Sequence, residues 1–182
     1  MYLRLAHSAP TEALPQEECV RAFDQELDYV FASLRRLGAP APDLEDLAHD
    51  VFVVLLRHWS TLDTSRPLRP YLFGVAFRIV SAHRRRRLRE VPNLTDEPAD
   101  TGAGPEKMLQ SHQAVALLHA ALEQVPLPRR AVLIMHELDG IPIADVAREL
   151  SITRFGAYAR LHKGHKELAA AVRRLRGHGA TR

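Results

Sequence analysis

Apolar residues recur every three or four positions along most of the N-terminal half, and this spacing predicts amphipathic helices. Between residues 16 and 38 the stripe consists of Cys19, Val20, Phe23, Leu27, Val30, Phe31 and Leu34. A second stripe consists of Leu44, Leu47, Ala48, Val51, Phe52, Leu55 and Leu56. A third, which starts near Pro67 or Pro70, consists of Leu72, Val75, Ala76 and Ile79. We expect Gly38 to end the first helix and Asp43 to cap the second.

The same spacing returns in residues 108–176 and predicts four further helices there. The first of them ends at Pro126, and Gly140 ends the next. Pro142 opens a short third helix, and residues 151–153 form a turn before the last one. We find no segment that alternates with period two, so the prediction is an all-α protein.

A change of composition divides the chain. Residues 91–107 hold three prolines, two glycines and four acids, without helical or strand periodicity. Such a segment buries too little apolar surface to order itself. We therefore expect two small helical domains, residues 16–90 and 108–176, joined by a flexible linker. Residues 1–15 and 177–182 are expected to be a flexible N-terminus and a tail.

Charge and cysteine content suit a cytoplasmic protein that binds nucleic acid. The net charge is +3, and residues 112–182 carry 11 Arg/Lys against six Asp/Glu, so basic charge is concentrated there. The single cysteine, Cys19, excludes an internal disulfide, fits a reducing compartment and is expected to pack in the core. Neither a secretory signal nor an apolar run near the ~18 residues of a membrane span is visible, so we expect no membrane insertion.

The segment from Ile141 to Lys166 has the dimensions of a helix-turn-helix. Two helices are joined by a three-residue turn, and the small Ala147 allows their close crossing. The second helix presents side chains that can reach bases and phosphates in a major groove. These are Arg154, Tyr158, Arg160, His162 and Lys163.

Enzymatic and metal sites are not indicated. The chain has ten histidines but no HExxH pattern, and His162 and His165 have no evident third ligand. We find no nucleophile–base set and no glycine-rich phosphate loop. The expectation is a protein without catalytic residues, metal or cofactor.

Two stretches carry a family resemblance. LEQVPLPRRAVLIMHELDGIPIADVARELSITRFGAYARLHKGHKEL resembles region 4 of bacterial sigma factors, and DLEDLAHDVFVVLLRH followed by RPYLFGVAFRIVSAHRRRR resembles region 2. Their order, and the lack of a region 3 between them, are similar to the extracytoplasmic-function (group 4) sigma factors of the sigma-70 family. The resemblance covers about residues 23–168. It implies an alternative sigma factor that directs RNA polymerase core to promoters.

The resemblance also implies partners and surfaces. Region 2 would bind the β′ clamp of the polymerase through the outer face of the second helix. Val54 lies at the edge of this face. Region 4 would bind the β flap. That face consists of Glu45, Asp46, His49, Asp50 and Val53. An anti-sigma factor is a further expected partner.

Promoter DNA would be read at two places. The loop of residues 60–69 would capture a flipped base of the single-stranded −10 element, aided by the third helix. The candidates are Thr61, Asp63, Thr64, Arg69, Tyr71, Arg78 and Arg85. The helix-turn-helix would read the duplex −35 element. Phe73 and Phe77 either pack in the core or contact DNA, and Trp59 is expected to be core.

The chain departs from the family pattern in both regions. Residues 155–160 read Phe-Gly-Ala-Tyr-Ala-Arg where the family usually has Gly-Thr-Val-Lys-Ser-Arg, and Gly74 replaces a frequent arginine. The promoter sequence therefore does not follow from relatives. Two other functions stay open from the residues alone: a helix-turn-helix regulator without sigma activity, and an interaction protein that binds partners through its charged faces.

Overall fold

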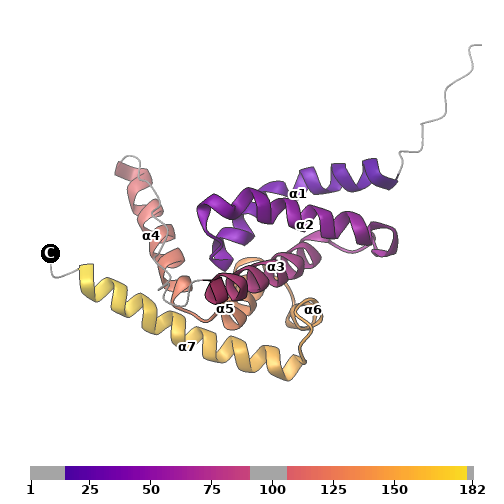
Figure 1. Cartoon of the computed structure of the whole chain (residues 1–182). Helices are drawn as coiled ribbons and strands as arrows, with labels where there is room; N and C mark the ends of the chain where they lie inside the picture. The colour runs from indigo at the N-terminus through magenta and orange to yellow at the C-terminus, as the bar shows by residue number, and fades with distance from the viewer. Residues whose placement is uncertain (1–14, 91–105, 180–182) are drawn as a thin grey trace, which may run out of the picture.

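The computed structural model describes residues 15–90 and 106–179, and the regular elements in these ranges are all helical (Figure 1). The all-α prediction is confirmed. Residues 1–14, 91–105 and 180–182, where we expected the flexible N-terminus, most of the linker and the end of the tail, lie outside the described residues.

The N-terminal half forms three helices that contact one another pairwise. They are α1 (Pro15–Leu37), α2 (Leu44–His58) and α3 (Leu68–Glu90). Short 3-10 turns, η1 (Ala41–Asp43) and η2 (Trp59–Thr61), precede and follow α2. The predicted stripes form the core between them, and Cys19 and Phe73 are both fully buried.

Gly38 ends α1 as predicted. It has a φ of +86°, which L side chains rarely adopt, and its N–H donates to the carbonyl of Arg35 at 2.9 Å. The N–H of Ala39 donates to the carbonyl of Leu34 at 3.0 Å. These two bonds form a Schellman motif, which satisfies carbonyls that the helix itself leaves free.

The predicted cap at Asp43 is wrong. Asp43 has φ −97° and ψ −2°, because it ends the turn η1, and its side chain makes no capping hydrogen bond. A capping residue normally has an extended backbone that returns its side chain to the helix. Instead, Asp43 Oδ2 lies 3.0 Å from His83 Nε2 on α3, an ion-pair distance without hydrogen-bond alignment.

Two residues at the edges of the predicted stripes are not core. Val20 on α1 is 42% exposed and Leu56 on α2 is 37% exposed. Apolar residues of a wide stripe lie on both sides of the contact line, and a single neighbouring layer covers only the middle. Leu56 therefore faces outward, whereas Leu55 is buried.

The C-terminal half forms a second group of helices. It consists of α4 (Glu106–Glu123), α5 (Leu127–Leu133), α6 (Ile143–Glu149) and α7 (Arg154–Gly179). A π-helical turn, η3 (Ile134–Leu138), continues α5. The long helix α7 contacts α4, α5 and α6, so it forms one side of the molecule (Figure 1).

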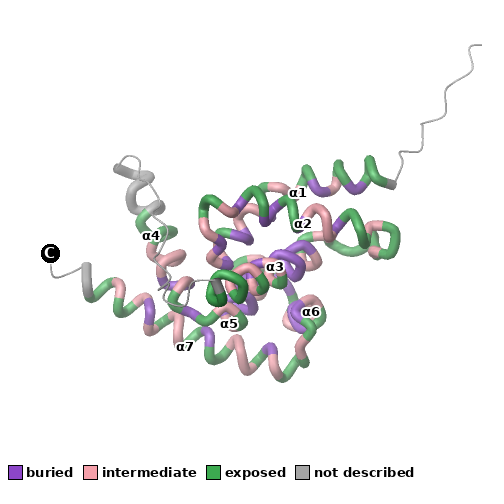
Figure 2. The backbone as a smooth tube through the Cα atoms, viewed as in Figure 1, coloured by how far each residue is buried: buried purple, intermediate pink, exposed green. Residues whose placement is uncertain are grey.

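The two groups share one hydrophobic core. Helix α1 contacts α4 and α5, and α3 contacts α6. Buried side chains from both groups form a single cluster, which includes Leu34, Val80, Leu122 and Ile134. Buried positions accordingly occur on the facing sides of both groups in Figure 2.

A buried arginine connects the groups. Arg130 is only 2% exposed, and its Nη1 donates to the carbonyl of Leu37 at the end of α1, at 3.0 Å. Its Nε and Nη2 donate to the carbonyls of Val125 and Glu123. A Cβ on Gly38 would lie 2.6 Å from Arg130 Nη1, so glycine also makes room for this contact.

A second polar link joins α1 to the residue after η3. Asp139 accepts hydrogen bonds from the Tyr29 hydroxyl at 2.7 Å and from Arg36 Nη1 at 3.1 Å. Burial raises the pKa of Asp139, although Tyr29 and Arg36 act to lower it. Burial and the neighbouring Asp139 raise the pKa of Tyr29. The phenol therefore stays protonated and remains a donor to the carboxylate.

We predict that Arg130→Met lowers the free energy of unfolding by about 3 kcal/mol, because three main-chain carbonyls lose a buried donor. The matched control is Arg129→Met. Arg129 forms a partly exposed ion pair with Glu167 at 2.7 Å, and its loss should lower the free energy by less than about 1 kcal/mol. Urea unfolding followed by circular dichroism measures both. Equal losses would contradict the assigned role of Arg130.

Candidate nucleic-acid interface

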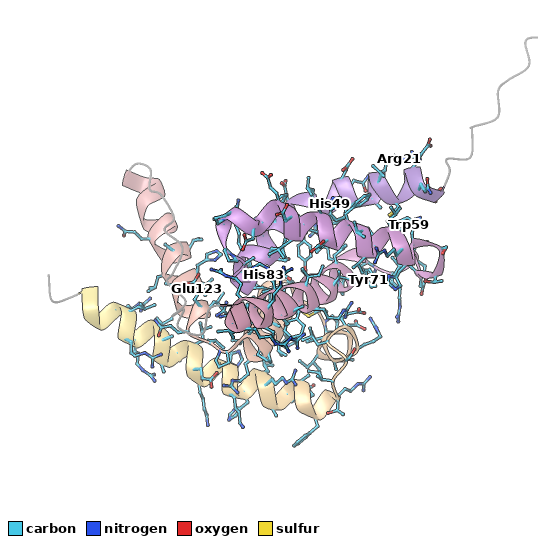
Figure 3. The ribbon with its side chains drawn as sticks, in the orientation of Figure 1. Arg21, His49, Trp59, Tyr71, His83 and Glu123 are labelled. Atoms are coloured by element: carbon cyan, nitrogen blue, oxygen red, sulfur yellow. The ribbon has the colours of Figure 1, made fainter. Side chains whose placement is uncertain are left out.

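The outer face of α2 is acidic with an apolar end. Glu45, Asp46, His49 and Asp50 are all exposed, as predicted from the sequence. The apolar end differs from the prediction, because Val53 is half-buried and Val54 packs against the core. By helical periodicity the exposed Leu56 lies beside Val53 and takes the place of Val54 on this face. Figure 3 labels His49 on this helix.

The loop after α2 is organised by Asp63. The carboxylate accepts hydrogen bonds from the main-chain N–H and the hydroxyl of Ser65, and Arg66 lies 3.7 Å away. These hydrogen bonds, with Arg66, hold the pKa of Asp63 below its ordinary value. The Thr61 hydroxyl donates to the carbonyl of His58 at 2.9 Å, and Thr64 is exposed. Asp63 and Thr61 therefore fix the loop's shape.

Arg69 is held against α1. Its Nε donates to the carboxylate of Glu26 at 2.7 Å, and its guanidinium carbon lies 5.2 Å from the centre of the Tyr29 ring. The side chain is still 60% exposed. Neither partner was predicted from the sequence, because both are far from Arg69 along the chain; Glu26 is 43 residues away.

Arg78 and Tyr71 on α3 face α6. Arg78 Nη1 donates to the carbonyl of Glu149, the last residue of α6, at 3.1 Å. A Cβ on Gly74 would lie 3.0 Å from the same carbonyl oxygen, so glycine at this position permits the close approach of α6. Tyr71 is half-buried, and burial raises its pKa. In this arrangement, α6 covers part of the face of α3 that was expected to meet DNA.

The C-terminal end of α3 is strongly basic. Arg85 is exposed there, and it lines a shallow groove with Ala82, Arg86 and Arg89. Figure 3 labels Tyr71 near the start of α3 and His83 farther along it, and Arg85 follows His83 by two residues. The seven −10 candidates thus extend along α3 and its preceding loop and do not form one compact pocket.

Helices α6 and α7 form the predicted helix-turn-helix. Ala147 is buried at their contact, and the N–H of Ile152 donates to its carbonyl at 2.9 Å. Ser151 has a φ of 53°, and its N–H donates to the carbonyl of Arg148 at 3.1 Å. The turn is therefore a second Schellman motif, in which a serine occupies the left-handed position.

The N-terminus of α7 is capped by Thr153. Its hydroxyl oxygen accepts a hydrogen bond from the N–H of Gly156 at 3.0 Å. A Cβ on Gly156 would lie 3.1 Å from that oxygen, so glycine suits the cap. This explains a glycine that otherwise weakens a helix interior.

The predicted recognition residues lie on the exposed side of α7, with one exception. Arg154, Tyr158, His162 and Lys163 are exposed, whereas Arg160 is half-buried on a flank of the helix. Phe155, which is not among the predicted recognition residues, is 84% exposed in the first turn. Its position just after the turn was the available signal, but an apolar residue does not indicate DNA contact by composition alone.

The His, Cys, Asp and Glu side chains of the described residues do not gather into a metal site. No group of three or more His, Cys, Asp or Glu side chains there is placed to hold a metal ion. His165 Nε2 instead lies 3.1 Å from the carboxylate of Glu137. Within residues 15–90 and 106–179, none of the helices combines the length and apolar character needed to cross a membrane.

Comparison with known proteins identifies the family. Residues 22–90 match Sigma-70 region 2, and residues 116–168 match Sigma-70, region 4. The ECF RNA polymerase sigma factor SigF of Caulobacter vibrioides is 26% identical over 148 residues, 79% of each chain. SigL of Mycobacterium tuberculosis is 26% identical over 162 residues, 88% of this chain and 90% of that protein.

The chain belongs to the ECF sigma factors of the sigma-70 family. Sigma factors are DNA-binding regulatory subunits of RNA polymerase, and this one directs promoter-specific initiation of transcription. A helix-turn-helix regulator without sigma activity is not favoured, because it leaves the region 2 match unexplained.

Solved sigma factor structures share the fold of this sigma factor. RpoE in complex with the anti-sigma factor NepR, from Bartonella quintana, has a TM-score of 0.66 at 20% identity, covering 84% of this chain and 98% of that one. CnrH in complex with the cytosolic domain of CnrY has a TM-score of 0.59 at 17% identity, covering 85% and 87%.

We predict that Ser151→Gly stabilises this sigma factor by about 0.5–1 kcal/mol. Relief of the left-handed strain, about 1–2 kcal/mol, exceeds the entropy cost of glycine in the unfolded chain, about 0.4–1 kcal/mol. Ser151→Ala keeps the strain and is the control, which should give no gain. Urea unfolding measures the difference, and equal stability of the two variants would refute the strain argument.

Proposed function

We propose that this sigma factor binds RNA polymerase core through the outer face of α2. The face consists of Glu45, Asp46, His49, Asp50, Val53 and Leu56. Exposed acids beside an apolar patch suit a basic clamp surface, where charge guides the encounter and apolar contact adds affinity. The β′ clamp would occupy this face, and the β flap would contact region 4. The face and the helix-turn-helix lie on different helices, with α3 between them (Figure 1).

Reading of the −10 element is assigned to the loop after α2 and to α3. Asp63 gives the loop a fixed shape, and Thr64 and Arg85 are exposed for contact with single-stranded DNA. A fixed loop favours capture of a flipped base, because less entropy is lost on binding. Arg78 is exposed as well, but its Nη1 donates to the carbonyl of Glu149, so the whole guanidinium joins this surface when α6 leaves α3.

The packed arrangement is therefore assigned to the free sigma factor, and an open one to the holoenzyme. Polymerase core would separate the two groups of helices by binding region 2 and region 4 at distant sites. The free energy gained by binding polymerase must exceed the free energy lost when the contacts of Arg130 and Asp139 break. The −35 element would be read by α7, with Lys163 and Arg154 on phosphates.

Regulation in trans is the remaining part of the proposal. The structures of RpoE and CnrH each contain a partner, which is the anti-sigma factor NepR for RpoE and the cytosolic domain of CnrY for CnrH. A protein of this kind would hold the sigma factor inactive by covering its polymerase-binding surfaces. The sigma factor would act in the cytoplasm and without catalytic chemistry of its own.

The polymerase contact can be tested by charge reversal. The double variant Asp46→Arg and Asp50→Arg should reduce affinity for core polymerase at least about 100-fold, because two attractive contacts become repulsive. The matched control reverses Asp24 and Asp28, two exposed acids with the same spacing on α1. Fluorescence anisotropy with core polymerase measures both. Equal affinities of the two double variants would exclude the α2 face.

The two DNA readers can be separated in the reconstituted holoenzyme. Arg78→Ala should weaken binding of −10 single-stranded DNA and leave duplex −35 binding unchanged. Lys163→Ala should do the reverse and lower the slope of log affinity against log salt by roughly 1. The free wild-type chain should bind −10 DNA far more weakly than the holoenzyme. Equal binding by the free chain would show that α6 does not obstruct α3.

A further inference from the structure

Two aromatic side chains stand exposed on the first turns of α7. Phe155 is 84% exposed and Tyr158 is 57% exposed, and Phe155 is the most exposed of the large apolar residues in the described ranges. The core side of α7 is formed by Ala157, Leu161, Gly164, Leu168 and Ala171. At 3.6 residues per turn, Phe155 and Tyr158 therefore share the opposite face.

Hydrogen bonds fix the backbone that carries Phe155 and Tyr158. Thr153 caps the helix by accepting from the N–H of Gly156, and Ser151 closes the preceding turn with a Schellman motif. Side chains on a fixed helix end lose little entropy when they bind. An exposed phenylalanine gains nothing from this position in the free protein, because its ring stays in water.

The position itself has a chemical meaning in a helix-turn-helix. The N-terminal residues of the second helix contact base edges in the major groove. A phenylalanine has no donor or acceptor and so does not read the hydrogen-bonding pattern of a base. The apolar feature of the major groove is the C5-methyl group of thymine, which apolar side chains contact.

We propose that Phe155 determines promoter specificity by packing against a thymine methyl group of the −35 element, with Tyr158 beside it. This inference rests on the proposed function, in which α7 enters the major groove of the −35 duplex. The exposed Arg154, His162 and Lys163 hold the helix on the phosphates, and Phe155 supplies the sequence preference.

The test removes single methyl groups from the DNA. Holoenzyme reconstituted from the full chain and core polymerase first selects its −35 sequence from duplexes randomised there. Each selected thymine is then replaced by deoxyuridine, which lacks only the methyl group. We expect the selection to enrich thymine at one or two adjacent positions. Deoxyuridine there should weaken binding about fourfold, the value of one buried methyl group.

The Phe155→Ala holoenzyme should bind the thymine duplex more weakly and should no longer distinguish thymine from deoxyuridine. Tyr158→Phe should still distinguish thymine from deoxyuridine, because it retains the aromatic ring at position 158. Lys163→Ala should weaken both duplexes equally. The matched control is Val115→Ala on α4, an apolar residue that is 53% exposed, and it should leave affinity and discrimination unchanged.

Unchanged discrimination in Phe155→Ala would overturn the proposal, as would selection of a −35 element without thymine. Loss of affinity for core polymerase in Phe155→Ala, with discrimination intact, would instead make the ring a protein contact. A wild-type holoenzyme that selects no −35 sequence would refute the proposed function of α7 itself. Normal helicity of Phe155→Ala is expected, since the side chain is exposed, and circular dichroism verifies it.

Discussion

The buried guanidinium of Arg130 bonds to three main-chain carbonyls, and the arrangement of the two helical groups depends on this contact. One of these carbonyls belongs to Leu37, which is 93 residues away in the sequence. A planar group with five donors can serve several carbonyls at once, and a buried charge without such partners is costly. Gly38 is required beside it, because a Cβ would lie 2.6 Å from Nη1. The end of α1 and the start of α5 are thus adapted to each other.

This packing decides which surfaces are available. It brings α6 against α3, where Gly74 permits the close approach and Arg78 binds the last carbonyl of the short helix. The outer face of α2 and the first turns of α7 remain exposed. The polymerase-binding face is therefore accessible before the face of α3 that α6 covers. This suits a protein that binds polymerase before it reads single-stranded DNA. A partner that binds an open arrangement more tightly than the packed one can shift the equilibrium between them.

Much of the fold and part of the site could be predicted from local patterns. Periodicity located the helices, because burial of one helix face repeats every three to four residues. The roles of Gly38 and Ala147 were predicted correctly. Gly38 adopts the left-handed backbone conformation that ends α1, and Ala147 allows two helices to cross closely, and both roles favour small residues. The predicted cap at Asp43 and the predicted core position of Leu56 were wrong. The first has a helical backbone at the end of a 3-10 turn, and the second lies beyond the reach of the neighbouring layer.

The sequence by itself determined the helices, the helix-turn-helix and membership of the sigma factor family, because these depend on residue type and on short spacings. Tertiary structure alone decided the partners of the charged residues. Arg69 pairs with Glu26, and Arg36 pairs with Asp139, over 43 and 103 residues of chain. The exposure of Phe155 was decided in the same way. Such contacts depend on how helices cross and which face each one covers, and local spacing carries no information about either.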